Sequence, residues 1–189
     1  MDLFIKQMKI ERINMKVIIT EREKLKVVGM KISTTMKDNS IPQLWNDFIA
    51  RMDELAEIAV PDCSLGVCLN EINADLDGSD FFDYLACKVV RDDSIIPSGM
   101  EFHEIPAQLV AVFTHFGSLD TLSETYDYIY DEWLPESEYK IIDAAEVEWY
   151  DSRFRYGEKD SQIDIHIPIA KKDDDEDVDA EEMFFVKEN

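Results

Sequence analysis

GMEFHEIPAQLVAVFTHFGSLDTLSETYDYIYDEWLPE, residues 99–136, is the stretch that decides the fold. Its first half is rich in strand formers, which predicts strands over 100–105 and 107–115, followed by a turn at Gly117 and Ser118. The second half predicts one amphipathic helix with a capping box at Thr121 and Glu124 and an end at Pro135. The helical spacing of three or four residues is kept by Leu119, Leu122, Tyr126, Ile129 or Tyr130, and Trp133.

The same order of elements precedes and completes this stretch. Before it, the pattern predicts strands over 16–20 and 25–33, a helix over 40–58, and strands over 64–70 and 81–90. Ser40 should be the N-cap of that helix, with Gln43 completing a capping box. After it, residues 139–143 are expected to be a link, and strands are expected over 146–150 and 163–169.

The pattern strand–strand–helix–strand–strand therefore occurs twice, over 16–90 and 99–169. An offset of 83 residues places Glu21 on Glu104, Val27 on Val110 and Met30 on Phe113. Two ββαββ units predict an α+β fold with an antiparallel sheet, two main helices and a pseudo-twofold axis. A ligand cleft forms readily where two such halves meet.

The charge is strongly acidic, with 19 Lys and Arg against 42 Asp and Glu, a formal net charge of −23. Such a surface disfavours nucleic acid, which needs basic residues on its phosphates, and favours small cations or a basic partner. Residues 171–189 form an acidic tail that we expect to be disordered, and residues 1–15 form an N-terminal extension. No run of about 20 apolar residues predicts a membrane span.

The reactive residue types do not form a recognisable catalytic or metal motif. Cys63, Cys68 and Cys87 have no zinc-knuckle spacing, and an odd number of thiols favours a reduced, cytoplasmic setting. His103, His115 and His166 fall on three different predicted strands, so we expect no metal site and no cofactor. A phosphate-binding glycine loop and a G-x-S-x-G motif are absent from the sequence.

Four segments in order carry a family resemblance: IPAQLVAVFTHFGSL, TYDYIYDEWLPESEY, AEVEWYD and DIHIPIA. They resemble the GyrI-like small-molecule-binding domain, also found as the effector-binding module of AraC- and MerR-type multidrug regulators, over residues 16–170. The resemblance implies a duplicated SH2-like fold with a ligand cleft between the halves, and an aromatic pocket with a buried glutamate that attracts lipophilic cations. Family members often have Trp where Tyr126 stands. No helix-turn-helix is visible, so we expect a stand-alone member without direct DNA binding.

On the E-x-Y motif, the resemblance assigns the pocket glutamate to Glu148. Glu148 shares a strand face with Glu146 and Tyr150, whereas Val147 and Trp149 occupy the other face. Without the resemblance, a strand glutamate is usually solvated and aromatic residues on helices usually pack in the core. Aromatic residues expected to line the pocket are Trp45, Tyr84, Tyr126, Tyr128 and Trp133.

Three functions follow as hypotheses. The first is a sensor or sequestering protein for aromatic, cationic small molecules. The second, implied by the resemblance, is a hydrolase of reactive cyclopropane-bearing toxins, in which Glu148 and a pocket tyrosine would activate water. The third is a protein inhibitor of a basic partner such as DNA gyrase, which would use the acidic surface rather than the pocket.

Overall fold

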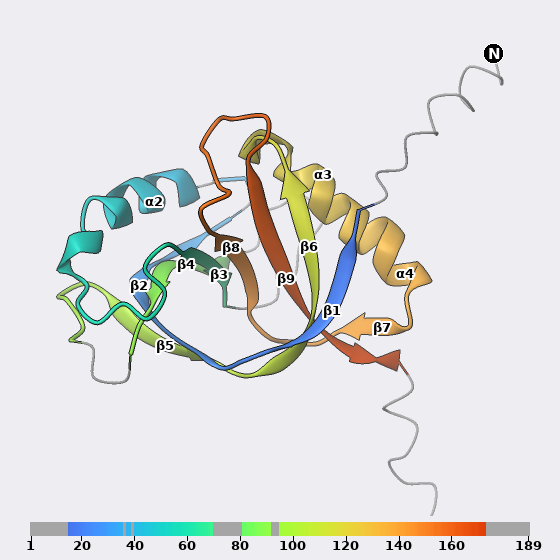
Figure 1. Ribbon diagram of the computed structural model, residues 1–189, viewed down its shortest axis with the longest axis horizontal. Helices are drawn as coiled ribbons and strands as arrows, with labels where there is room; N and C mark the ends of the chain where they lie inside the picture. Colours follow the sequence, from blue (N-terminus) through green and yellow to red (C-terminus); the bar gives the residue numbers. More distant parts are fainter. Residues whose placement is uncertain (1–14, 36, 39, 70–80, 92–94, 173–189) are drawn as a thin grey trace, which may run out of the picture.

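The computed structural model describes residues 15–35, 37–38, 40–69, 81–91 and 95–172 (Figure 1). The expectations for the N-terminal extension up to residue 14 and for the tail from residue 173 lie outside these residues. Nine strands form the antiparallel sheet, in the order β1-β6-β9-β8-β3-β4-β2-β5 with β7 beside β9. The predicted α+β class is confirmed.

The strands begin and end close to the predicted positions. Their bounds in chain order are β1 Val17–Arg22, β2 Leu25–Thr34, β3 Ser64–Cys68, β4 Phe82–Val89, β5 Glu101–Ile105, β6 Gln108–Phe116, β7 Tyr139–Ile141, β8 Glu146–Tyr150 and β9 Gln162–Lys171. One expectation was wrong: the predicted link over 139–143 contains β7, because these residues pair with the end of β9.

The sheet has two equivalent halves. Counting inward from each edge, the strands of one half are β1, β6, β9 and β8, and those of the other half are β5, β2, β4 and β3. The registers follow the predicted offset of 83 residues. Glu21 lies opposite Leu109, and Lys26 lies opposite Glu104. The offset of 83 residues carries Glu21 onto Glu104 and Lys26 onto Leu109, so it carries one pair onto the other. The first strand of each repeat thus pairs with the second strand of the other repeat.

The first helix is shorter than predicted. Helix α2 is Ile41–Ile49, and a 3₁₀ turn, η1, follows at Met52–Glu54. Further along the chain, Ile58 forms an isolated antiparallel bridge with Val90. The predicted capping box is also wrong: Ser40 makes no side-chain cap, and Gln43 donates to Asp47, one turn later, at 2.8 Å.

The second helix is continuous but irregular. A 3₁₀ turn, η2 (Leu119–Thr121), leads into α3 (Leu122–Asp127), a π-helical segment η3 (Tyr128–Trp133) and α4 (Leu134–Glu136). The helix starts earlier than predicted, since Ser118 rather than Thr121 provides the cap by accepting from the Asp120 N–H. It also continues past Pro135, which falls in the first turn of α4, where proline is tolerated.

Both helices cover the same face of the sheet (Figure 1). Helix α2 packs over β2 and β4, where the cluster includes Val28, Leu44, Phe48 and Ala86. The second helix packs over β6 and β9, where Phe113, Ile129 and Ile165 belong to one cluster. Between the two clusters lie β3 and β8, whose side chains on this face are mainly polar. We call this region the central strip: Ser64, Gly66, Cys68, Glu146, Glu148 and Tyr150.

The opposite face carries a third apolar cluster, which includes Val27, Leu65, Leu85 and Val147. The three cysteines are buried free thiols. Near this cluster, Trp149 and His166 stack with ring centroids 5.6 Å apart. Burial, together with the charge of Arg22, lowers the pKa of His166 to about 4. Protonation of His166 is therefore disfavoured in the folded protein.

The stability of the fold should consequently fall as pH drops from the unfolded pKa of His166, 6.5, towards its folded value of about 4. Between pH 7 and pH 5, the parent should lose about 2 kcal/mol more than His166→Gln, because only the parent must keep an unprotonated imidazole. Urea unfolding of both proteins at the two pH values measures this difference. The variant also loses the stacking on Trp149, but this loss lowers its free energy of unfolding equally at both pH values and cancels in the comparison. Equal losses would show that His166 is not the group that titrates.

Candidate functional site

Glu148 lies at the centre of the helix-covered face. It stands on β8, directly opposite Gly66 of β3 and Ile165 of β9. Its neighbours Val147 and Trp149 point to the other face, as the alternation of a strand requires. Glu148 is only 9% exposed. A buried carboxyl group of this kind needs hydrogen-bond partners, because its desolvation is otherwise costly.

Three tyrosines provide those partners, and they come from both repeats. Tyr84 of β4 donates to Glu148 Oε2 at 2.5 Å, and Tyr150 of β8 donates to the same oxygen at 2.8 Å. Tyr126 of α3 donates to Oε1 at 3.2 Å. The two oxygens of one carboxylate thus bind phenols from two strands and a helix.

The ionisation of the tyrosines supports these donor roles. Burial raises the pKa of Tyr84, Tyr126 and Tyr150 well above the ordinary value, and the charge of Glu148 raises each further. The three phenols therefore stay protonated near neutral pH and donate to the carboxylate. Among the described residues, no Lys, Arg or His forms an ion pair with Glu148. Its polar environment within this part of the chain consists of neutral hydroxyl groups.

Trp45 brings helix α2 to the same place. Its indole Nε1–H donates to the Tyr84 hydroxyl at 3.4 Å. Its ring also meets Tyr150 edge to face, with centroids 5.1 Å apart. Trp45 is half-buried, so it lies at the boundary between the cluster under α2 and the central strip.

The second helix faces the central strip with two stacked rings. Tyr126 and Tyr130 have centroids 6.3 Å apart and planes only 10° from parallel, and Tyr130 donates to Glu146 on β8. The π-helical segment begins between them, and π-helical turns are frequent at functional sites. Ile129, in the same segment, is fully buried against the sheet.

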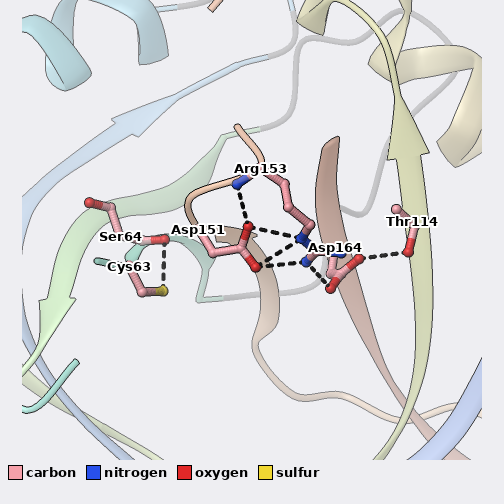
Figure 2. Close-up of polar contacts among 6 residues, drawn as sticks. All are labelled: Cys63, Ser64, Thr114, Asp151, Arg153 and Asp164. Carbon is pink, nitrogen blue, oxygen red and sulfur yellow. Dashed lines mark hydrogen bonds and ion pairs between the residues drawn. The ribbon is translucent and has the colours of Figure 1, made fainter. Parts of the chain in front are cut away.

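A charged network joins the loop after β8 to two neighbouring strands (Figure 2). Arg153 binds Asp151 through Nε and Nη2, and Nη2 also binds Asp164 at 2.5 Å. Thr114 of β6 donates to Asp164 at 2.7 Å, and hydrogen bonds from Arg153 lower the pKa of Asp151. The network ties the loop after β8 to β9 and β6. That loop carries Phe154, whose ring meets Tyr150 edge to face at 4.9 Å.

The structure brings together four of the six residues that the sequence analysis selected: Glu148, Trp45, Tyr84 and Tyr126. The other two aromatic residues belong elsewhere. Trp133 has its ring contacts with Phe113 and Tyr139, and Tyr128 packs against the same core cluster under the second helix. Within the described residues, neither makes a hydrogen bond or ring contact with Glu148, Tyr84 or Tyr150.

Sequence reasoning missed three aromatic members of the site. Tyr150 was placed on the face of Glu148 but not selected, although two residues along a strand is the spacing that brings side chains together. Tyr130 was treated as a helix-face residue only. Phe154 lies in a predicted polar loop, and no pattern in the sequence signals that it packs on Tyr150.

Neither a metal-binding cluster nor a membrane-spanning helix is present in the described part of the chain. No group of three or more His, Cys, Asp or Glu side chains there could hold a metal ion. Over the same residues, no helix has the length and apolar character needed to cross a bilayer. His115 instead joins β6 to the start of the second helix, with Nδ1 2.8 Å from the Thr125 hydroxyl and Nε2 3.1 Å from the Ser118 carbonyl.

Known proteins share this sequence pattern and fold. The transcriptional regulator BrlR of Pseudomonas aeruginosa is 36% identical over 157 residues, which cover 82% of this chain and 56% of BrlR. The chain thus spans about half the length of that relative. SAV2435 bound to tetraphenylphosphonium has a similar fold, with a TM-score of 0.64 at 16% identity over 82% of this chain and 94% of SAV2435.

The EcmrR–DNA complex is similar to the same degree, with a TM-score of 0.64 at 16% identity over 90% of this chain and 63% of EcmrR. The profile of the family described as GyrI-like small molecule binding domain matches residues 15–170. This match covers most of the sequence and all nine strands of the sheet. The chain therefore belongs to the GyrI-like small-molecule-binding domain family.

Proposed function

We propose that this chain binds aromatic, lipophilic cations at the central strip and acts as a sensor or sequestering protein for them. The observation that carries the proposal is Glu148: a carboxylate only 9% exposed, held by three phenols and without a basic partner among the described residues. The ligand-contacting residues are proposed to be Glu148, Trp45, Tyr84, Tyr126 and Tyr150.

The chemistry of the site favours a cation with delocalised charge. Burying a carboxylate is costly unless an opposite charge compensates it, and a bound cation would supply that charge. The faces of the surrounding Trp and Tyr rings attract cations by about 0.5–2 kcal/mol per contact. A delocalised cation also loses less hydration than a compact ammonium group when it enters an aromatic site. The net charge of −23 would raise the local concentration of such ligands.

Two relatives support this assignment by analogy. SAV2435 was solved with tetraphenylphosphonium, an aromatic cation of this kind, and it shares the fold at 16% identity. BrlR is a transcriptional regulator and is 36% identical over the matched region. A role in sensing, with the response carried by another domain or protein, is consistent with both.

The proposal is tested by isothermal calorimetry with tetraphenylphosphonium and with neutral triphenylphosphine oxide, at low and high salt. We expect the cation to bind more tightly at both salt concentrations. Salt should weaken the contribution of the surface charge, which acts through solvent and is screened over about 8–10 Å, more than that of the buried carboxylate. Equal binding of the cation and the neutral compound would contradict the proposal.

The hydrolase hypothesis is less well supported by the contacts of Glu148. A general base must hold the reacting water by a hydrogen bond, and both carboxylate oxygens of Glu148 already accept hydrogen bonds from phenols. Glu148 accepts three such bonds. The hypothesis of a gyrase inhibitor rests on the acidic surface alone and does not use the site.

A further inference from the structure

Gly66 lies at the point where the two repeats meet. It is paired with Glu148 across β3 and β8, and the exchange of strands that relates the repeats places Gly66 where Glu148 stands. Each has one further neighbour on the same face: Ala86 of β4 for Gly66, and Ile165 of β9 for Glu148. The centre of the sheet therefore holds one carboxylate and one position without a side chain.

The space above Gly66 is filled by the site itself. A Cβ atom on Gly66 would lie 1.9 Å from the Tyr84 hydroxyl oxygen, 2.7 Å from Tyr84 Cζ and 2.8 Å from Glu148 Oε2. Real Cβ atoms essentially never approach other heavy atoms closer than 3.0 Å. The backbone does not demand a glycine here, because Gly66 is not among the residues with positive φ. What demands it is the phenol of Tyr84 and the carboxylate that this phenol binds.

We propose that Gly66 is a positioning residue for the cation site. Its missing side chain is the space that lets the Tyr84 hydroxyl reach Glu148 and hold the carboxylate at the centre of the central strip. Any side chain at position 66 would separate Tyr84 from Glu148 without changing either group chemically. This inference rests on the proposed function, since it assigns the role of Gly66 in that same site.

Because Gly66 contacts Tyr84, the effect of Gly66→Ala should depend on the residue at position 84. The clash involves both the hydroxyl oxygen and Cζ, so removing the hydroxyl alone would not relieve it. In the Tyr84→Phe background, Gly66→Ala should therefore still clash with the ring and disturb the site. In the Tyr84→Val background, which lacks the ring, the new methyl group should fit. Glu148 Oε2 lies at the end of a flexible side chain and can move by the small distance that remains.

The experiment measures binding of tetraphenylphosphonium and triphenylphosphine oxide to the single and double variants, with circular dichroism as the check on folding. Gly66→Ala should lower cation affinity by about tenfold or more, as expected for losing a hydrogen bond to a charged group, and should change binding of the neutral compound far less. Adding Gly66→Ala to Tyr84→Val should change affinity by less than about threefold, since the two residues then no longer interact.

A measurement without ligand separates this inference from the proposed function. In the alkaline titration of tyrosine absorbance, the parent should show Tyr84 among its late-ionising phenols, because burial and Glu148 raise the pKa of Tyr84. Gly66→Ala should lower the pKa of one tyrosine towards the ordinary value. In the Tyr84→Phe background, Gly66→Ala should cause no such change. A result of this kind with no cation binding by the parent would defeat the proposed function and keep the positioning role.

Three results would overturn the role of Gly66. The first is a folded Gly66→Ala protein with the affinity, selectivity and tyrosine titration of the parent. The second is a Gly66→Ala, Tyr84→Val protein that fails to fold while Tyr84→Val folds, because the glycine would then be needed for another reason. The third is an effect of Gly66→Ala on cation affinity that is as small in the Tyr84→Phe background as in the Tyr84→Val background.

Discussion

Glu148→Gln is expected to weaken binding of tetraphenylphosphonium by about 2–5 kcal/mol, the range found when one partner of a buried charge pair is removed. The substitution keeps the size of the side chain and removes its charge. It also places an amide NH₂ group where an oxygen accepted hydrogen bonds. Tyr84 and Tyr150 donate to one oxygen and Tyr126 to the other, so at least one phenol can no longer donate to residue 148. Binding of a neutral aromatic compound should change far less.

Glu124→Gln is the matched control for this experiment. Glu124 lies exposed on α3, two residues before Tyr126, so its replacement removes the same charge from the same helix-covered face without entering the site. Its effect on cation binding should be small at low salt and vanish at high salt, because solvent screens a surface charge. The effect of Glu148→Gln should persist at high salt. A Glu148→Gln protein that binds the cation as tightly as the parent would remove Glu148 from the site.

The sequence predicted the sheet better than the helices. Strand positions follow from alternation and turn residues, and the offset that overlays Glu21 on Glu104 relates the registers of the two outer strand pairs to each other. Helix details depended on contacts that periodicity does not contain. Helix α2 ends at Ile49, earlier than the apolar spacing predicted, and Gln43 binds Asp47 instead of completing a cap.

The site was predictable to the extent that it lies on strands. The family resemblance selected Glu148, and the alternation of β8 predicted which face it occupies; Tyr84 lies on a strand of the first repeat. The aromatic residues of the second helix were harder to assign, since Tyr126, Tyr130 and Trp133 all fit the same amphipathic pattern. Tyr126 and Tyr130 are the two whose hydroxyl groups reach β8, and a π-helical segment begins between them. No pattern in the sequence announced that segment.

The site also depends on the core on either side of it, and Phe113 is the most informative residue there. Phe113 is fully buried on β6, and Trp133 meets it edge to face with centroids 5.0 Å apart. Its register partners are Val17 of β1 and Ile165 of β9, so it joins an outer strand, an inner strand and the second helix. That helix carries Tyr126 and Tyr130 to β8, so loss of Phe113 should loosen one wall of the site.

Phe113→Ala should therefore lower the free energy of unfolding by about 3–5 kcal/mol, the usual cost of removing a buried aromatic side chain and leaving a cavity. Phe116→Ala is the matched control, because Phe116 ends the same strand but is 63% exposed, and its loss should cost about 0.5 kcal/mol or less. Trp133→Ala should fall between them, since Trp133 is only half-buried. Urea unfolding of the three variants measures the order. Equal midpoints for Phe113→Ala and Phe116→Ala would mean that the second helix is not held on the sheet through Phe113, and the position of Tyr126 would need another cause.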